Sequence, residues 1–220
     1  MASRPTRRAW LAGLVVPLLV VAGCGGTADG NGVVTGVSSH LSDNMNGAVL
    51  DTPYSLADAT LTDDAGQPFD LHQHLDKPLT LVFFGYSHCP DICPAVMANL
   101  ASAFARLDAA DASKVQVWFV TTDPGRDTPA VLKTYVGRFN PAFEGLTGSI
   151  KDIVDVANSV HIAVEKGPKL PGGGYEITHS TPVLGVRKNG SVPILWTEGT
   201  SPSGLATDIT AIFHGKPELS

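Results

Sequence analysis

The chain has 220 residues, of which 43% are hydrophobic and 16% are charged, and its formal net charge is -6. These values allow one folded domain with appendages, and they exclude a disordered or collagen-like chain. Three cysteines are too few for a disulfide-stapled miniprotein. The acidic balance argues against nucleic acid as a partner, because phosphate binding needs clustered Lys and Arg.

The N-terminus carries the pattern of an export signal. Three arginines (Arg4, Arg7 and Arg8) precede an apolar run at residues 11–21, which is too short for a conventional membrane-spanning helix. The run ends in Val-Ala-Gly-Cys, which resembles a lipoprotein signal in which Cys24 is lipidated and becomes the new N-terminus. The alternative is a cleaved secretory peptide in which Cys24 is an ordinary residue. The paired arginines also resemble a twin-arginine signal, so the export route stays open.

This signal sets the compartment of the remaining chain. We expect residues 1–23 to be signal peptide, residues 24–50 to be a flexible tether and residues 51–220 to be the folded domain. The domain would then be extracytoplasmic and lipid-anchored to the cell membrane, where thiols can be oxidised or can carry metal.

The predicted elements follow in chain order. A turn signal at residues 63–66 indicates a β-hairpin within residues 50–75, and a continuous apolar run at residues 79–86 indicates a buried strand. The later pattern predicts a helix at 94–107, a strand at 115–120, helices at 128–139 and 149–160, strands at 181–187 and 192–197 joined by an Asn-Gly turn, and a helix at 203–214. A central βαβ unit followed by ββα, with an N-terminal β-hairpin extension, predicts an α/β chain with a thioredoxin-like fold.

Cys89 and Cys93 lie where the first buried strand meets the following helix. Four residues make about one helical turn, so both sulfur atoms can lie on one face, and the N–H groups at a helix N-terminus stabilise a thiolate. Such a pair can exchange electrons as a dithiol and disulfide, or it can hold a soft ion such as Cu(I). Two other interpretations of the cysteine pair are a structural disulfide and the active site of a peroxiredoxin-like peroxidase.

Three segments resemble the Sco/SenC family of copper-binding, thioredoxin-like proteins that serve the assembly of cytochrome c oxidase. They are Gly-Tyr-x-x-Cys-Pro-Asp-x-Cys-Pro at residues 85–94, Asp-Pro-x-Arg-Asp-Thr-Pro at residues 123–129 and Gly-Leu-Thr-Gly at residues 145–148. The resemblance implies a metallochaperone that delivers copper, as Cu(I), Cu(II) or both, to the dinuclear copper site of the oxidase's copper-bearing subunit. Exchange of thiolate and imidazole ligands would transfer the ion.

The same resemblance implies that Cys89, Cys93 and His179 hold the copper. An imidazole is also the expected third ligand on chemical grounds, because two thiolates leave copper under-coordinated. The family usually has an aspartate where this chain has Thr178, which removes a charged partner for the His179 ring. His88 is the rival third ligand, but on an extended segment its side chain should point away from that of Cys89.

Other residues near this site have open roles. Asp123 and Arg126 should lie at the carboxyl end of the second buried strand, on the same edge of the sheet as the cysteines. Asp123 then has three candidate roles: it tunes the site, it contacts a partner, or it is only a residue of the turn that enters the next helix. Asp91 either bonds to the local backbone or receives a partner. We expect residues 166–174, which are rich in Gly and Pro, to form a mobile loop that carries His179 towards the sulfur atoms.

The rival function is a thiol-disulfide oxidoreductase that reduces the cysteines of the oxidase or of another exported protein. It needs Cys89 and Cys93 but not His179, so the histidine discriminates between the two classes. Whether the chain is an enzyme depends on that choice. We expect a monomer.

Overall fold

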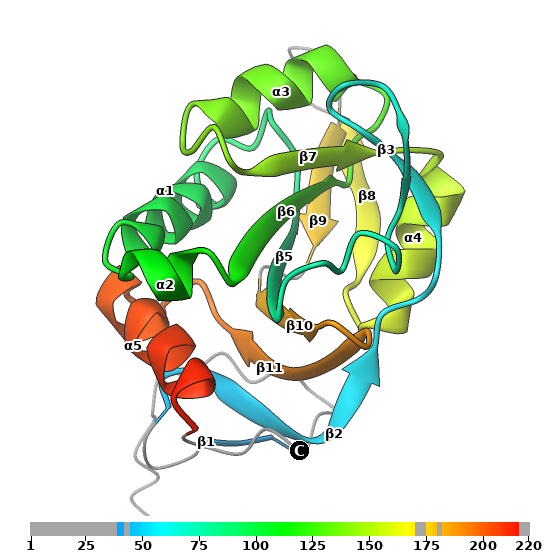
Figure 1. Cartoon of the computed structure of the whole chain (residues 1–220). Coiled ribbons are helices and arrows are strands. Elements are labelled where there is room, and N and C mark those ends of the chain that lie inside the picture. The colour runs from blue at the N-terminus through cyan, green and yellow to red at the C-terminus, as the bar shows by residue number, and fades with distance from the viewer. Residues whose placement is uncertain (1–38, 42–44, 170–174, 180–181, 216–220) are drawn as a thin grey trace, which may run out of the picture. The chain divides into compact units, whose positions relative to one another are not determined.

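The computed structural model describes residues 39–41, 45–169, 175–179 and 182–215 (Figure 1). Its strands are β1 (Ser39–Leu41), β2 (Ala48–Ser55), β3 (Thr60–Asp63), β4 (Pro68–Asp70), β5 (Leu79–Gly85), β6 (Val115–Thr121), β7 (Glu144–Thr147), β8 (Val164–Lys169), β9 (Tyr175–His179), β10 (Val183–Arg187) and β11 (Ser191–Trp196). Its helices are α1 (Ile92–Phe104), α2 (Ala109–Ala112), α3 (Pro129–Gly137), α4 (Ile150–Ser159) and α5 (Pro202–Phe213). Within this described part, no helix is long and apolar enough to cross a membrane.

One mixed sheet organises the described residues, with the strand order β1-β2-β11-β10-β5-β6-β7-β3-β4. β5, β6 and β7 are parallel, and α1 makes the crossover between β5 and β6. β10 pairs antiparallel with β5, and β11 continues the sheet on that side before the chain enters α5. The α/β class and the order of a central βαβ unit followed by ββα, both predicted from the sequence, are confirmed.

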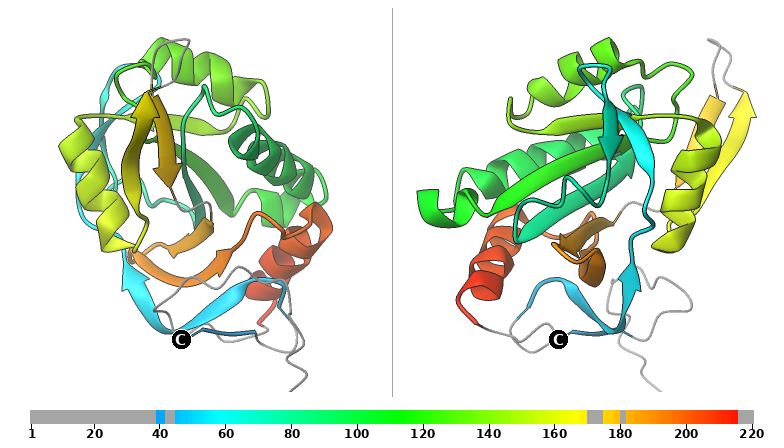
Figure 2. Two further views of the ribbon diagram at one scale, coloured as in Figure 1. Left: turned by 180° about the vertical axis from the view of Figure 1, so that it is seen from behind. Right: turned by 45° about the vertical axis from the view of Figure 1, so that its right-hand side comes forward.

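The central strands are buried on both faces. On β5, Leu81 and Phe83 belong to the buried cluster that α1, α3 and α5 cover, whereas Val82 and Phe84 belong to the cluster that α4 covers. Figures 1 and 2 show these helices on the two sides of the sheet. Burial of alternating side chains on opposite faces explains why β5 is a continuous apolar run without polar alternation.

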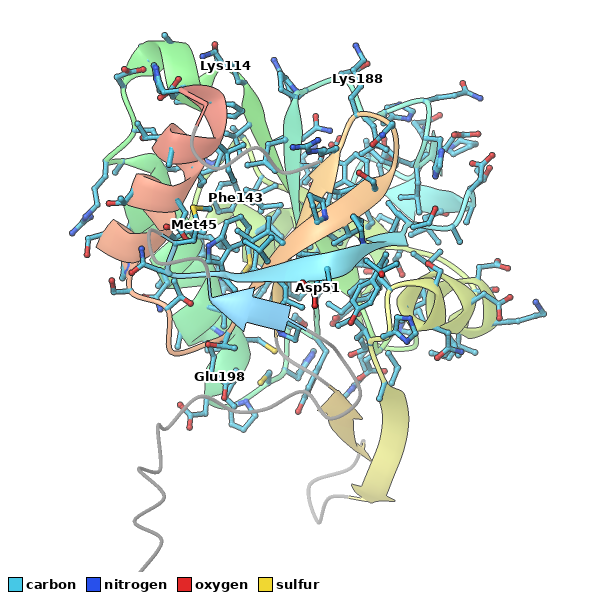
Figure 3. All side chains as sticks on the ribbon, turned by 90° about the horizontal axis from the view of Figure 1, so that it is seen from below. Met45, Asp51, Lys114, Phe143, Lys188 and Glu198 are labelled. Carbon is cyan, nitrogen blue, oxygen red and sulfur yellow. The ribbon has the colours of Figure 1, made fainter. Side chains whose placement is uncertain are left out.

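The folded part begins before residue 51, where the sequence analysis placed its start. Met45, labelled in Figure 3, lies in the same buried cluster as residues of α5, and β2 begins at Ala48. The Asp208 carboxylate of α5 accepts hydrogen bonds from the N–H of Asn46 at 2.9 Å, the N–H of Gly47 at 2.8 Å and the indole N–H of Trp196 at 2.7 Å. This buried carboxylate therefore joins the N-terminal segment, β11 and the last helix.

Several elements differ from the sequence-based prediction. β3 and β4 form the expected hairpin around residues 63–66, but β2 instead pairs with β11 on the other side of the sheet. β7, β1 and the one-turn helix α2 were not predicted. Residues 166–169 of the expected mobile loop lie in β8, which pairs with β9 in a separate two-stranded sheet. Residues 170–174 of that loop, the signal peptide and Cys24 lie outside the described residues.

Candidate metal centre

The loop that carries the cysteines is fixed at the carboxyl end of β5. Its first residue after the strand, Tyr86, accepts a hydrogen bond from the N–H of Cys89 at 3.1 Å, which closes a turn. α1 then begins at Ile92, two residues earlier than predicted. Pro94 consequently lies in the first helical turn, where a missing N–H costs no intrahelical bond. Cys89 thus precedes the helix and Cys93 lies in its first turn.

The two thiols have different surroundings. Cys93 is fully buried, whereas Cys89 is half-buried, and no disulfide joins them. The N–H of Cys93 points at the sulfur of Cys89, with 3.4 Å between the nitrogen and Sγ. The thiol of Cys93 is also hydrogen-bonded to the sulfur of Cys89, so both sulfur atoms lie on the same side of the helix start, as their spacing predicts.

Their acidities are shifted in opposite directions. Burial raises the pKa of the Cys89 thiol, but hydrogen bonds from the N–H groups of Cys93, Asp91 and Ile92 and from the Cys93 thiol outweigh it and lower the pKa overall. Burial raises the pKa of the Cys93 thiol far above its usual range, and the negative charges of Cys89 and Asp127 add to this effect. Cys89 is the more readily ionised of the pair, and Cys93 holds its proton.

Gly85 makes room for the buried thiol. A Cβ atom on this residue would lie 3.1 Å from the sulfur of Cys93 and 2.9 Å from a ring carbon of Phe119. The contact with Phe119 is shorter than real Cβ atoms make and the contact with the sulfur is tighter than most, so any larger residue at the end of β5 would force buried neighbours to move. Its carbonyl also accepts the N–H of Thr122 at 2.7 Å, which ties the ends of β5 and β6 together.

Asp123 and Arg126 follow β6 at the same edge of the sheet as the cysteine loop. They form an ion pair, and the Arg126 guanidinium lies 5.9 Å from the centre of the Tyr86 ring. The pair therefore braces the first residue of the cysteine loop from the neighbouring strand. Asp91 directly precedes α1 and is exposed, and its side chain makes no capping hydrogen bond.

Comparisons with known proteins place this chain in a family. The SCO1/SenC family profile matches residues 49–214. The chain belongs to the SCO1/SenC family. It is 39% identical to the mitochondrial SCO2 protein of Saccharomyces cerevisiae over 122 residues, which are 54% of this chain and 40% of that protein. It is 30% identical to a putative copper-binding protein of Stutzerimonas stutzeri over 152 residues, which are 69% of this chain and 74% of that protein.

Solved structures of Sco proteins share the fold. ScoI of Bradyrhizobium japonicum, whose structure was solved with copper bound, is 31% identical, with a TM-score of 0.62 over 72% of this chain and 96% of that one. This match confirms the thioredoxin-like fold that the sequence predicts. This SCO1/SenC chain spans only about two fifths of the length of its yeast relative.

The donor set of this SCO1/SenC chain suits a soft ion. Thiolates favour Cu(I), zinc and iron–sulfur clusters over harder ions, and this site presents one partly exposed sulfur beside one buried sulfur. Among the described side chains, no group of three or more His, Cys, Asp or Glu residues is arranged to hold a metal. The described residues thus supply two soft donors to such an ion.

The backbone of His179 ends β9, where it pairs with Val164 of β8. Figure 2 shows this hairpin beside α4. The ring of His179 is not among the described side chains, so its role as third ligand stays a prediction. The Nδ1 of the rival His88 lies 2.9 Å from the hydroxyl of Ser87, and the described side chains do not bring His88 together with the two cysteines as a metal-binding group.

Asp127 is a residue of this site that the sequence analysis quoted only within a motif. It is fully buried, and it accepts hydrogen bonds from Ser87 of the cysteine loop and from Thr121 of β6. The carboxylate between Arg126 and Thr128, the N-cap of α3, carries no local signal of burial. Only the position of Ser87, 40 residues earlier in the chain, reveals the role of Asp127.

Proposed function

We propose that this chain is an extracytoplasmic copper carrier that binds the ion through Cys89, Cys93 and His179. The observation that carries the proposal is the pair of sulfur atoms at the start of α1, one with a lowered pKa and one buried. Copper-bound ScoI of Bradyrhizobium japonicum, at 31% identity, supports copper as the ion. The likeness to a putative copper-binding protein of Stutzerimonas stutzeri supports it as well.

The thiols imply an order of events. Cys89 meets an incoming ion first, because it is partly exposed and more readily deprotonated. Cys93 becomes a ligand only after its proton leaves, so copper binding releases a proton and weakens as the pH falls. The imidazole of His179, on the β8–β9 hairpin, would complete the coordination, and movement of this hairpin would expose the ion to a client.

Delivery follows from the same chemistry. Thiolates of the client would displace Cys93, Cys89 and His179 one after another, so that copper passes across without a change in its oxidation state. We propose the copper-bearing subunit of cytochrome c oxidase as the client. We also propose that Cys24 is lipidated, that residues 1–23 are removed, and that the segment between Cys24 and β1 tethers a monomeric domain to the membrane. Asp91 and Asp123 would meet the client at the loop.

A thiol-disulfide oxidoreductase is the second candidate function. The asymmetry of the pair favours it, because a nucleophilic Cys89 beside a protonated, buried Cys93 is the arrangement of an attacking and a resolving thiol. Such an enzyme would reduce the cysteines of the oxidase before copper is loaded. It does not need His179.

Copper titration of the purified protein separates these candidates. We expect one equivalent of Cu(II) to give a thiolate-to-copper charge-transfer band in the wild type, and Cys89→Ser, Cys93→Ser and His179→Ala each to lose stoichiometric binding. His88→Ala is the matched control, and we expect it to keep the band. An unchanged band in His179→Ala would reject the carrier mechanism, and retained disulfide reductase activity in that variant would then favour the oxidoreductase.

A further inference from the structure

Asp127 lies under the cysteine loop as a buried carboxylate. Its exposed fraction is 0%, and Oδ2 accepts the N–H of Ser87 at 2.9 Å and the hydroxyl of Thr121 at 2.6 Å. The hydroxyl of Ser87 donates to Oδ1 at 2.5 Å. Three hydrogen bonds therefore hold this carboxylate to the cysteine loop and to β6.

No lysine or arginine nitrogen lies within 4 Å of this carboxylate among the described residues. Its neighbour Arg126 pairs with Asp123. The nearest basic group is the His88 ring, whose Nδ1 is 3.6 Å from Oδ1 and whose side chain is 53% exposed. A buried carboxylate without a fixed cation costs free energy unless another positive charge compensates it. The arrangement therefore leaves a negative charge that a cation bound nearby would stabilise.

The cysteine pair is the place where such a cation would bind. Ser87, which donates to both oxygens of Asp127, is two residues before Cys89. Hydrogen bonds thus connect the carboxylate to the loop that carries the cysteines.

We propose that Asp127 is a positioning residue that anchors the cysteine loop through Ser87 and that its buried negative charge raises the affinity of the site for Cu(II) more than its affinity for Cu(I). This inference rests on the proposed copper-carrier function. A dication gains twice as much from the charge as a monocation does. For charges about 10 Å apart at an effective dielectric constant of about 20, each unit of metal charge changes the affinity on the order of tenfold.

Asp127→Asn removes the charge and keeps the shape. The hydroxyls of Ser87 and Thr121 can turn to accept from the new amide, so the network can persist. Thr121→Val is the matched control, because it removes one hydrogen bond to the same carboxylate and leaves the charge in place. A role limited to packing or loop support would affect the two metal affinities alike in both variants.

The test is competition titration of the full-length protein with chelators of known affinity, separately for Cu(II) and Cu(I). We expect Asp127→Asn to lower the ratio of Cu(II) to Cu(I) affinity about tenfold, and Thr121→Val to leave the ratio unchanged. An unchanged ratio in Asp127→Asn, or an equal change in both variants, would overturn the inference. If the wild type binds neither ion through its cysteines, the proposed function itself fails.

A second variant decides the matter if Asp127→Asn does not fold. Ala130 is exposed and lines an open groove of about 380 Å³ together with Ser87 and His88. A lysine there, Ala130→Lys, adds a positive charge beside the loop without changing the buried hydrogen bonds. At low ionic strength we expect it to lower the same affinity ratio by a few-fold, and an unchanged ratio would reject the role of charge.

Discussion

Replacing Gly85 with alanine would put a methyl group in space that buried groups already occupy. The new Cβ would lie 2.9 Å from Phe119, 3.0 Å from Phe83 and 3.1 Å from the sulfur of Cys93. Both rings and the thiol are fully buried, so none of them can move into solvent. Overpacking a core in this way costs about 1–3 kcal/mol, and we expect the free energy of unfolding to fall by that amount.

The same substitution at Gly137 provides a matched control. Gly137 is the last residue of α3, and a Cβ there meets nothing within 4 Å. We expect Gly137→Ala to raise the free energy of unfolding by roughly 0.5 kcal/mol, because alanine loses less backbone entropy in a helix. Urea denaturation followed by circular dichroism measures both changes. A Gly85→Ala protein as stable as the wild type would show that Cys93 is not held against the end of β5.

Three further outcomes are expected. Asp208→Ala leaves the indole N–H of Trp196 without its acceptor and should lower the free energy of unfolding by about 1–3 kcal/mol or more, as measured by urea denaturation. A variant as stable as the wild type would contradict the role of Asp208 in joining the chain ends. Iodoacetamide should modify Cys89 faster than Cys93 at pH 7, as peptide mass spectrometry would reveal, because the pKa of Cys89 is lowered while burial raises that of Cys93. A hydrogen bond from a neighbouring lysine lowers the pKa of Asp111 below its usual 3.8. Its contribution to stability is therefore present above pH 3.8 and is lost as the pH falls through the lower pKa of the folded state. Asp111→Asn should therefore flatten the fall in stability as the pH drops below 3.8.

Strong local patterns account for what could be predicted. The apolar runs of β5 and β6 are continuous because both faces of each strand are covered, and the start of α3 follows from Thr128 and Pro129. Weak local patterns account for most of the misses. β7 has only four residues and includes a glycine, and β8 contains Gly167 and Pro168, which locally favour a loop. Pairing with β6 and β9 makes these segments strands.

The two cysteines and their place where a strand meets a helix follow from the sequence alone, because a strand, a turn and a helix start are determined by neighbouring residues. Tertiary structure decides which thiol is buried and what surrounds it. The buried carboxylates of Asp127 and Asp208 are partnered by Ser87 and Asn46, which are 40 and 162 residues away in the chain. Burial and charge depend on groups that only the folded chain brings together, and no local pattern records them.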